Sequence, residues 1–428
     1  MSAKRKNWAG NYEYGAQRLH LPHSVEDVRQ IVKHCRNLKA LGTCHSFNAI
    51  ADSAGDQISL KNLGRMELNS AVKTVTVGAG VTCGQLAPYL YRHGYALHNL
   101  ASLPHISLAG AAATATHGSG SASGNLATAV SAIEFVAANG ELAALSRERD
   151  GERFRGAVVH LGGLGVVTKL TLDLQPAREM RQVVYEDLCF SQLERHFDEI
   201  FSAGYSVSLF TDWQHHRATQ AWIKSCVDPS DDSGIAPEFF GAKLAAANLH
   251  PIPGPSPQNC TEQMGVPGPW HERLPHFRMN FTPSSGEELQ TEYFVPRERA
   301  REAILELEML RDRITPHLLV SELRTVAADE LWMSPSYRRA SATIHFTWKR
   351  NWPAVKALLP AIEDRLARFD ARPHWAKLFA MAPARLQSRY ERLAAFRELL
   401  AEYDPEGKFR NRYLSANLYV AKLRLAGG

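Results

Sequence analysis

The chain reads ASLPHISLAGAAATATHGSG from residue 101 to residue 120, and small side chains fill nearly every position from residue 107 onward. A run of this kind forms either a tightly packed helix or a stretch of backbone that lies against the phosphates of a ligand, because small side chains leave N–H groups accessible to an anion. The closing residues 117–120 (His-Gly-Ser-Gly) favour the second alternative. We therefore expect this segment to hold a phosphate-bearing ligand.

Two further segments are rich in glycine. Residues 78–80 (Gly-Ala-Gly) follow an expected strand and precede an expected helix, and with Gly84 they nearly match a dinucleotide-binding fingerprint. The nicotinamide version also needs an acidic residue roughly 20 positions later, and residues 98–104 contain none. We interpret residues 78–80 as a tight turn rather than a Rossmann site. Residues 162–165 (Gly-Gly-Leu-Gly) again place bare backbone just before an expected strand.

His45 lies at the end of an expected strand, within residues 41–48 (LGTCHSFN). Gly42, Ser46 and Asn48 favour a turn at this point. A single histidine on such a turn is more often structural than functional, so His45 by itself identifies no chemistry. Its interpretation depends on the segments that accompany it.

The first 178 residues alternate short β-branched runs with helical patterns. Ser24 is a suitable N-cap for a helix over residues 25–35, whose first turn is acidic. The turn at Asn139-Gly140 predicts a hairpin. Strands mixed with helices in this way indicate an α+β or α/β first domain. The other elements predicted here are strands over 38–43, 74–77, 133–137, 142–145 and 166–174, and a helix over 85–93.

The character of the sequence changes near residue 178. Residues 227–258 are rich in proline, glycine and aspartate, which predicts loops. The tail contains a helix followed by a turn at residues 404–407. We predict three segments, 1–178, a sheet-based 179–377, and 378–428. Within the second segment, strands are predicted over 206–210, 220–223, 320–326 and 343–348, and helices over 302–313 and 352–369.

Composition restricts the partners and the compartment. The 49 basic and 44 acidic residues give a net charge of +5 that is spread along the chain, so no nucleic-acid partner is expected. The sequence has no apolar run of about 18 residues and no signal-peptide pattern, so no membrane association is expected. The sequence has no CxxC pair, so we expect no metal site. We expect the protein to be cytoplasmic and its thiols to be reduced. The six cysteines are Cys35, Cys44, Cys83, Cys189, Cys226 and Cys260.

Several long motifs together resemble a known family. Residues 7–11 (NWAGN), 42–48 (GTCHSFN), 77–86 (VGAGVTCGQL), 102–120 and 160–168 (HLGGLGVVT) resemble the FAD-binding domain of the vanillyl-alcohol-oxidase type. Motifs in the C-terminal half resemble its sugar-alcohol branch, the alditol (xylitol) oxidases. These motifs are CTEQ at 260–263, VPGPWHER at 266–273, RPHWAK at 372–377, and Asp404-Pro405 with Lys408-Phe409.

The resemblance implies an α+β fold, in which a two-subdomain FAD-binding domain joins a separate sheet-based substrate (cap) domain and residues 378–428 return to the FAD-binding domain. It also implies that FAD is attached covalently through its 8α-methyl group to His45. A second group in the family adds a link to cysteine, but no cysteine lies between residues 84 and 188. Cys44 departs from the family, where a smaller residue is expected. The implied cofactor-binding residues are Leu41, Gly42, Thr43, Cys44, His45, Ser46, Phe47, Ser102, Ser107, Gly110, Ala111, Ala112, Ala113, His117, Gly118 and Val167.

The substrate side is indicated by strand periodicity. Glu322 and Arg324 share one face of their expected strand, because side chains alternate along a strand. Thr343, His345 and Thr347 likewise share a face, opposite three apolar residues. Such polar faces are either ordinary solvated surfaces or the lining of a pocket. The resemblance implies the pocket, and it adds Ser102 and Lys377 to it.

These residue types suit a polyol, whose hydroxyl groups each donate and accept a hydrogen bond. Arg324 and Lys377 would stabilise the alkoxide character that develops as the hydroxyl proton leaves. His345, or in second place Glu322, would accept that proton. Glu322, Arg324, Lys377, Thr347 and Ser102 would bind the substrate.

Three functions are compatible with the sequence. The first is a monomeric alditol oxidase that passes a hydride from a primary carbinol to the flavin and then reduces O2. The second is a sugar-lactone oxidoreductase (gulono- or arabinono-1,4-lactone) on the same fold. The third is a nicotinamide-dependent Rossmann protein or a non-catalytic flavin-binding module. The motifs at residues 45–48, 102–107 and 117–120 fit the first function best.

Overall fold

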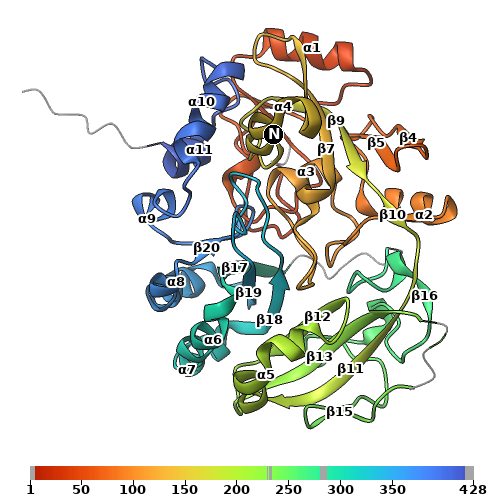
Figure 1. Ribbon diagram of the computed structural model, residues 1–428. Coiled ribbons are helices and arrows are strands. Elements are labelled where there is room, and N and C mark those ends of the chain that lie inside the picture. Colours follow the sequence, from red (N-terminus) through yellow and green to blue (C-terminus); the bar gives the residue numbers. More distant parts are fainter. Residues whose placement is uncertain (1–4, 229, 231–233, 280–286, 420–428) are drawn as a thin grey trace, which may run out of the picture.

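The computed structural model describes residues 5–228, 230, 234–279 and 287–419. Two sheet-based regions lie one above the other in Figure 1. We call residues 5–178 the first region and the described residues of 179–377 the second region, and the tail, residues 378–419, lies beside the first region. The chain therefore crosses between the two regions twice. Among the helices that the structure describes, none has the length and hydropathy needed to cross a membrane.

The first region contains two sheets. A small parallel sheet has the strand order β1-β3-β2, and an antiparallel sheet has the order β4-β5-β9-β7-β8. In the second of these, Val75 pairs with Leu172 and Val77 with Leu170, so apolar pairs face the core. The elements are β1 (Arg18–His20), α1 (Val25–His34), β2 (Leu38–Ala40), β3 (Asp56–Ile58), β4 (Met66–Asn69), β5 (Thr74–Gly78), α2 (Cys83–Arg92), β6 (Tyr95–Ala96), α3 (Leu108–Ala113), β7 (Val130–Val136), β8 (Leu142–Ser146), α4 (Arg147–Val158), β9 (Val166–Asp173) and β10 (Gln175–Pro176).

The second region is built on one ten-stranded sheet. Its path is β14-β15-β11-β13-β12-β18-β19-β17-β20, and β16 pairs with β11. In Figure 1, α5 to α8 cover one side of this sheet. The elements are β11 (Glu179–Cys189), α5 (Phe190–Ser202), β12 (Ser206–Thr211), β13 (Arg217–Cys226), β14 (Glu238–Phe239), β15 (Ala242–Leu244), β16 (Gly268–Pro269), β17 (Glu288–Pro296), α6 (Ala300–Glu308), α7 (Arg311–Ile314), β18 (Leu318–Val326), β19 (Ser341–Lys349), α8 (Trp352–Leu366) and β20 (Arg372–Pro373).

Both faces of the central strands in this sheet are buried. On β19, Ile344, Phe346 and Trp348 pack against the helices in one hydrophobic core. His345 and Thr347 point to the opposite face and are nevertheless only 8% and 6% exposed. The interpretation of this polar face as an ordinary solvated surface is therefore wrong.

Most predicted elements form, and two differ as follows. The strand predicted over 38–43 ends at Ala40, because its partner β3 ends at Ile58. The helix predicted over 302–313 is two helices, α6 and α7, because Leu310 leaves helical geometry (φ −100°, ψ 6°). Within residues 107–120, residues 108–113 form the helix α3, part of which lines the cavity described below, and irregular backbone follows it. Residues 78–80 form the predicted tight turn between β5 and α2.

The tail completes the first region. It contains α9 (Pro383–Gln387), α10 (Leu393–Tyr403) and α11 (Arg412–Leu418), whose apolar side chains join the same core as those of β5 and β9. Asn411 donates hydrogen bonds to the carbonyls of Ala49, Ile50 and Asp52. Leu38 N–H donates to the carbonyl of Lys408.

Lys39 joins three parts of the first region. Its side chain is buried, and its ammonium donates to the carbonyls of Leu161, Gly162 and Phe409 at 3.2, 2.9 and 3.1 Å. Strand β2, the glycine-rich segment 161–165 and the tail therefore meet at one cation. Three carbonyl acceptors match the three N–H donors of a protonated lysine.

We predict that Lys39→Met lowers the free energy of unfolding by about 2–4 kcal/mol, because three buried carbonyls lose their hydrogen-bond donor. Urea denaturation at pH 7 measures this loss, and Lys356→Met on the exposed side of α8 is the control. An unchanged urea midpoint for Lys39→Met would contradict the assigned role.

The lowered pKa of Lys39 predicts that the stability difference between wild-type protein and Lys39→Met depends on pH. Burial lowers the pKa of Lys39 to about 7, whereas the unfolded chain keeps this proton to about pH 10. Between these values the unfolded state binds more protons, so stability rises with pH. Native protein should gain stability over Lys39→Met between pH 7 and 10, by at most about 1.4 kcal/mol per pH unit.

Candidate active site

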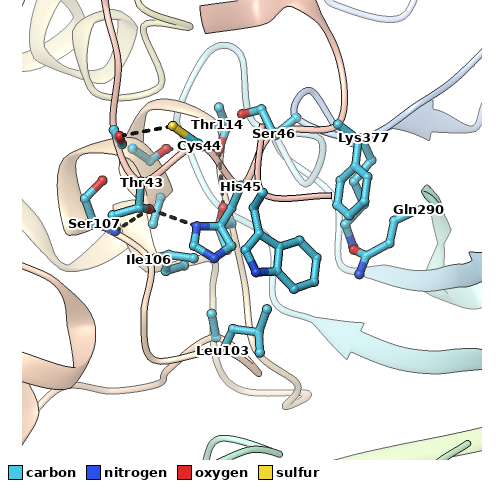
Figure 2. Close-up of a pocket in the computed structure, with 18 of the residues that line it drawn as sticks. Thr43, Cys44, His45, Ser46, Leu103, Ile106, Ser107, Thr114, Gln290 and Lys377 are labelled. Carbon is cyan, nitrogen blue, oxygen red and sulfur yellow. Dashed lines mark hydrogen bonds between the residues drawn. The ribbon is translucent and has the colours of Figure 1, made fainter. Parts of the chain in front are cut away.

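A cavity of about 710 Å³ lies where the two regions meet. The first region lines it with residues 39–47, parts of residues 101–117, and residues 160–162. The second region lines it with polar residues of β17, β18 and β19, together with His374, Ala376 and Lys377. Figure 2 shows His45 and Thr43 on one side and Gln290 and Lys377 on the other.

His45 is held in a fixed orientation. Its Nδ1 lies 3.0 Å from Thr43 Oγ1, which also accepts a hydrogen bond from Ser107 N–H (Figure 2). The indole of Trp8 stacks on the imidazole with 5.4 Å between ring centroids. Burial lowers the pKa of His45 to about 4, so the ring is neutral at physiological pH. Its Nε2 is buried without a hydrogen-bond partner among the described residues.

Cys44 occupies a position that favours glycine. Its backbone has φ of 63°, in the left-handed region where side chains other than glycine are strained. This conformation explains why a smaller residue is expected here. Burial raises the pKa of the Cys44 thiol.

The first-region side of the cavity fits a flavin dinucleotide. A Cβ atom added to Gly42 or Gly110 would lie 2.8 or 2.9 Å from Ser107 Oγ, so a larger residue at either position would require the Ser107 side chain to move. The volume lies within the 300–1,000 Å³ range of cofactor sites. The unpartnered His45 Nε2 and the small-residue lining are the observations that match such a group.

Glu292 is the centre of the second-region side. It is 1% exposed, and its carboxylate accepts hydrogen bonds from Lys377 Nζ at 2.7 Å and from Arg324 at 2.5 Å. His117 Nε2, from the first region, lies 3.3 Å away. Burial alone would raise the pKa of Glu292, but Lys377, Arg324 and His117 hold it well below its usual range. Burial lowers the pKa of Lys377, and Glu292 opposes that shift.

A polar row crosses three neighbouring strands. His345 on β19 lies directly opposite Glu322 on β18 and Glu292 on β17. Glu322 accepts a hydrogen bond from His276 at 2.8 Å and lies 3.6 Å from Arg324 Nε. Burial works against its charge, but Arg324 and His276 keep the pKa of Glu322 well below its usual range.

His345 has the properties of a neutral acceptor. Burial, together with Lys377, lowers its pKa to about 4. Its Nδ1 lies 3.8 Å from Glu322 Oε2, and its Nε2 is buried with no partner among the described residues. Arg324 Nε is likewise buried without a hydrogen-bond partner there. The cavity thus has an unpaired acceptor and an unpaired donor in its wall.

The structure brings most of the predicted site residues together. It leaves out two, since Ala112 packs into the hydrophobic core and Gly118 lies against Asn99 and Leu100, where a Cβ would meet oxygen atoms at 2.4 and 2.5 Å. These two residues do not line the cavity. Those that do are Leu41, Gly42, Thr43, Cys44, His45, Ser46, Phe47, Ser102, Ser107, Gly110, Ala111, Ala113, His117, Val167, Glu322, Arg324, His345, Thr347 and Lys377.

Sequence reasoning missed Glu292, His276, Glu288 and Gln290, all of which line the cavity. A signal was present on β17, because Glu288, Gln290 and Glu292 alternate with Leu289 and Thr291. That alternation is the same one that identified β18 and β19.

Comparisons with known proteins agree with this architecture. A family model described as an FAD binding domain matches residues 16–146, and one described as D-arabinono-1,4-lactone oxidase matches residues 283–417. The cholesterol oxidase of B. sterolicum superposes with a TM-score of 0.76 at 16% identity, over 97% of this chain and 96% of that one. The likeness to cholesterol oxidase shows the fold alone.

Two curated relatives extend over nearly the whole chain. L-gulonolactone oxidase of Bos taurus is 27% identical over 443 residues, which covers 97% of this chain and 98% of the relative. An alditol oxidase from a Streptomyces species is 46% identical over 423 residues, which covers 97% and 99%. The chain belongs to the alditol oxidase family, among the FAD-linked oxidases of the vanillyl-alcohol-oxidase type.

Proposed function

We propose that this protein oxidises the terminal hydroxyl group of alditols such as xylitol and sorbitol to the aldose, with reduction of O2 to H2O2. The observation that carries the proposal is the cavity wall in which Lys377 and Arg324 share the carboxylate of Glu292 beside the unpartnered His345 Nε2. The 46% identity to an alditol oxidase supports the same substrate class. FAD, when bound, supplies the hydride acceptor and the link to O2.

The cofactor would be held by the residues that line the first-region side of the cavity. We propose a covalent link through His45, because its neutral ring presents an unpartnered Nε2. We also propose that residues 1–178 and 378–428 form the FAD-binding domain and residues 179–377 the substrate domain. The hydrogen bonds of Asn411 and Lys39 between tail and first region support this division. The cytoplasmic location and the monomeric state stay predictions.

Lys377 and Arg324 would act on the reacting oxygen. Both are buried cations in the cavity wall that Glu292 and Glu322 hold in place, so they are fixed donors that favour an oxygen on which negative charge develops. His345 would accept the hydroxyl proton, because its ring is neutral and its Nε2 is unpartnered. Glu322, Thr347 and Ser102 would bind the other hydroxyl groups of the polyol.

The covalent link predicts that flavin fluorescence persists on the wild-type protein in a denaturing gel and disappears in His45→Ala. The variant should still bind FAD reversibly, because the small-residue lining is unchanged. His93→Ala is the control, since His93 is exposed, bonds to the Tyr89 carbonyl and lies outside the cavity lining. Fluorescence that survives in His45→Ala would assign the link to another residue.

The electrostatic role predicts that Lys377→Met slows anaerobic flavin reduction by roughly 10²–10³-fold, which is the usual cost of one preorganised donor. Stopped-flow measurement with xylitol reports this rate directly, and flavin content and Tm check the fold. Thr347→Val should act mainly through KM, because a hydroxyl contact binds ground state and transition state alike. Reduction of Lys377→Met at the wild-type rate would refute the assignment of this pocket.

The substrate class predicts peroxide release with xylitol, sorbitol, mannitol or glycerol. We expect kcat/KM for the best polyol to exceed that for gulono- and arabinono-1,4-lactone by at least about tenfold, or about 1.4 kcal/mol in transition-state binding. A peroxide-coupled assay on both panels, with oxygen uptake measured in parallel, makes the comparison. The reverse preference would favour the sugar-lactone oxidoreductase, to which the second family model points.

A further inference from the structure

A second hollow, of about 520 Å³, lies in the first region and shares no lining residue with the first cavity. His20, Cys35 and Asp56 meet there. The three side chains offer a nitrogen, a sulfur and an oxygen, and these ligand atoms all lie within 4.8 Å of one another. Among the residues that the structure describes, these three form the one group of possible metal ligands that lie this close together.

The small parallel sheet brings them together. In the pairing of β1 with β3, His20 lies opposite Ile58, so Asp56, two residues earlier, is on the same face as His20. Cys35 is the C-cap of α1, the helix that connects β1 to β2. His20 and Asp56 side chains are 26% and 19% exposed, and Cys35 is half-buried. The cluster is therefore sheltered but open to solvent.

The distances approach those of a tetrahedral zinc site. Zinc bonds of about 2.0–2.3 Å at tetrahedral angles place neighbouring ligand atoms about 3.3–3.6 Å apart. Cys35 Sγ lies 3.4 Å from Asp56 Oδ2 and 3.8 Å from His20 Nε2. His20 Nε2 lies 2.8 Å from Asp56 Oδ2. The separation of 3.4 Å already fits, the one of 3.8 Å would close by about 0.2 Å, and the one of 2.8 Å would open by about 0.5 Å as a hydrogen bond is replaced by two metal bonds.

The arrangement does not suit a cysteine nucleophile. A Cys-His-Asp triad places the histidine between the thiol and the carboxylate, whereas here Asp56 lies between Cys35 and His20 and contacts both. Burial, with Asp56 as hydrogen-bond partner, raises the pKa of Cys35 to about 11. Without a cation this thiol is mostly protonated at neutral pH and reacts slowly.

We propose that His20, Cys35 and Asp56 bind one Zn²⁺ ion, with water as the fourth ligand. Binding forms metal bonds to sulfur, nitrogen and oxygen and releases the thiol proton to solvent, so the thiolate and the carboxylate balance the charge of the ion. Arg18 and Arg36 border the hollow and oppose the ion electrostatically. The site fastens α1 to the edge of the small sheet, and the spacing of its ligands in sequence, 15 and 21 residues, follows no familiar zinc motif.

Zinc binding can be tested on the flavin-loaded, full-length enzyme after treatment with a chelator. We expect titration calorimetry with ZnCl2 to give one ion per chain, with a matching metal content after desalting. Native alkylation with iodoacetamide, read peptide by peptide, should slow at least about tenfold at Cys35 when zinc is present. Cys189 and Cys226 are exposed and serve as controls within the same molecule.

Variants identify the ligands. Cys35→Ser and His20→Gln should each weaken zinc binding by at least about 100-fold, since even changes outside the ligand shell cost 10–100-fold. Cys226→Ser should bind zinc like the wild type, and an unchanged flavin spectrum confirms the fold of each protein. Absence of binding by wild-type protein, alkylation of Cys35 at the same rate with and without zinc, or full binding by Cys35→Ser would each overturn the proposal. The alkylation result stands on wild-type protein alone, so it holds even if a variant fails to fold.

Discussion

The buried carboxylate of Glu292 is the interaction on which the active-site side of this molecule depends. An isolated charge in the protein interior is very costly, so Glu292 requires Lys377, Arg324 and His117 close by. These partners come from β18, from the segment after β20 and from the first region. One charge-balance requirement therefore fixes the relative placement of three parts of the chain, and with Glu322 beside Arg324 the two carboxylates balance the two cations of the cavity wall.

The two faces of the ten-stranded sheet differ in polarity and in role. Its helix-covered face supplies a continuous apolar core, in which Trp348 and Phe346 stack 4.8 Å apart. Its other face carries the polar row of Glu322, His345 and Glu292 and is closed by the first region. Because neither face meets solvent, a polar residue on this sheet needs a partner in the protein, a ligand, or both. The unpaired Nε2 of His345 belongs to the groups that a ligand would satisfy.

Features that depend on neighbouring residues were predictable from the sequence. Ser24 caps α1 together with Asp27, as the pattern indicated, and the Asn139-Gly140 turn joins β7 to β8. The identity of His45 as a cavity residue came from long motifs rather than from its immediate surroundings. Gly118 looked similar to the other small residues nearby, but close packing against Asn99 accounts for it instead.

Features that depend on pairing between distant strands were not predictable from one sequence. The role of Glu292 in the site depends on its position opposite His345 in the sheet and on its contact with His117 of the other region. Likewise, His20, Cys35 and Asp56 share no recognisable spacing, because their proximity results from the parallel register of β1 and β3. The pattern on each strand is local, whereas the contact between strands is a property of the whole fold.

The strained backbone at Cys44 places a thiol in the wall of a cavity where the proposed reaction would release peroxide. Peroxide attacks the thiolate form of cysteine far more readily than the thiol. Because burial raises the pKa of Cys44, a smaller fraction of its sulfur is thiolate than in an exposed cysteine. Burial thereby makes the residue less sensitive to the oxidant that the proposed reaction would release beside it.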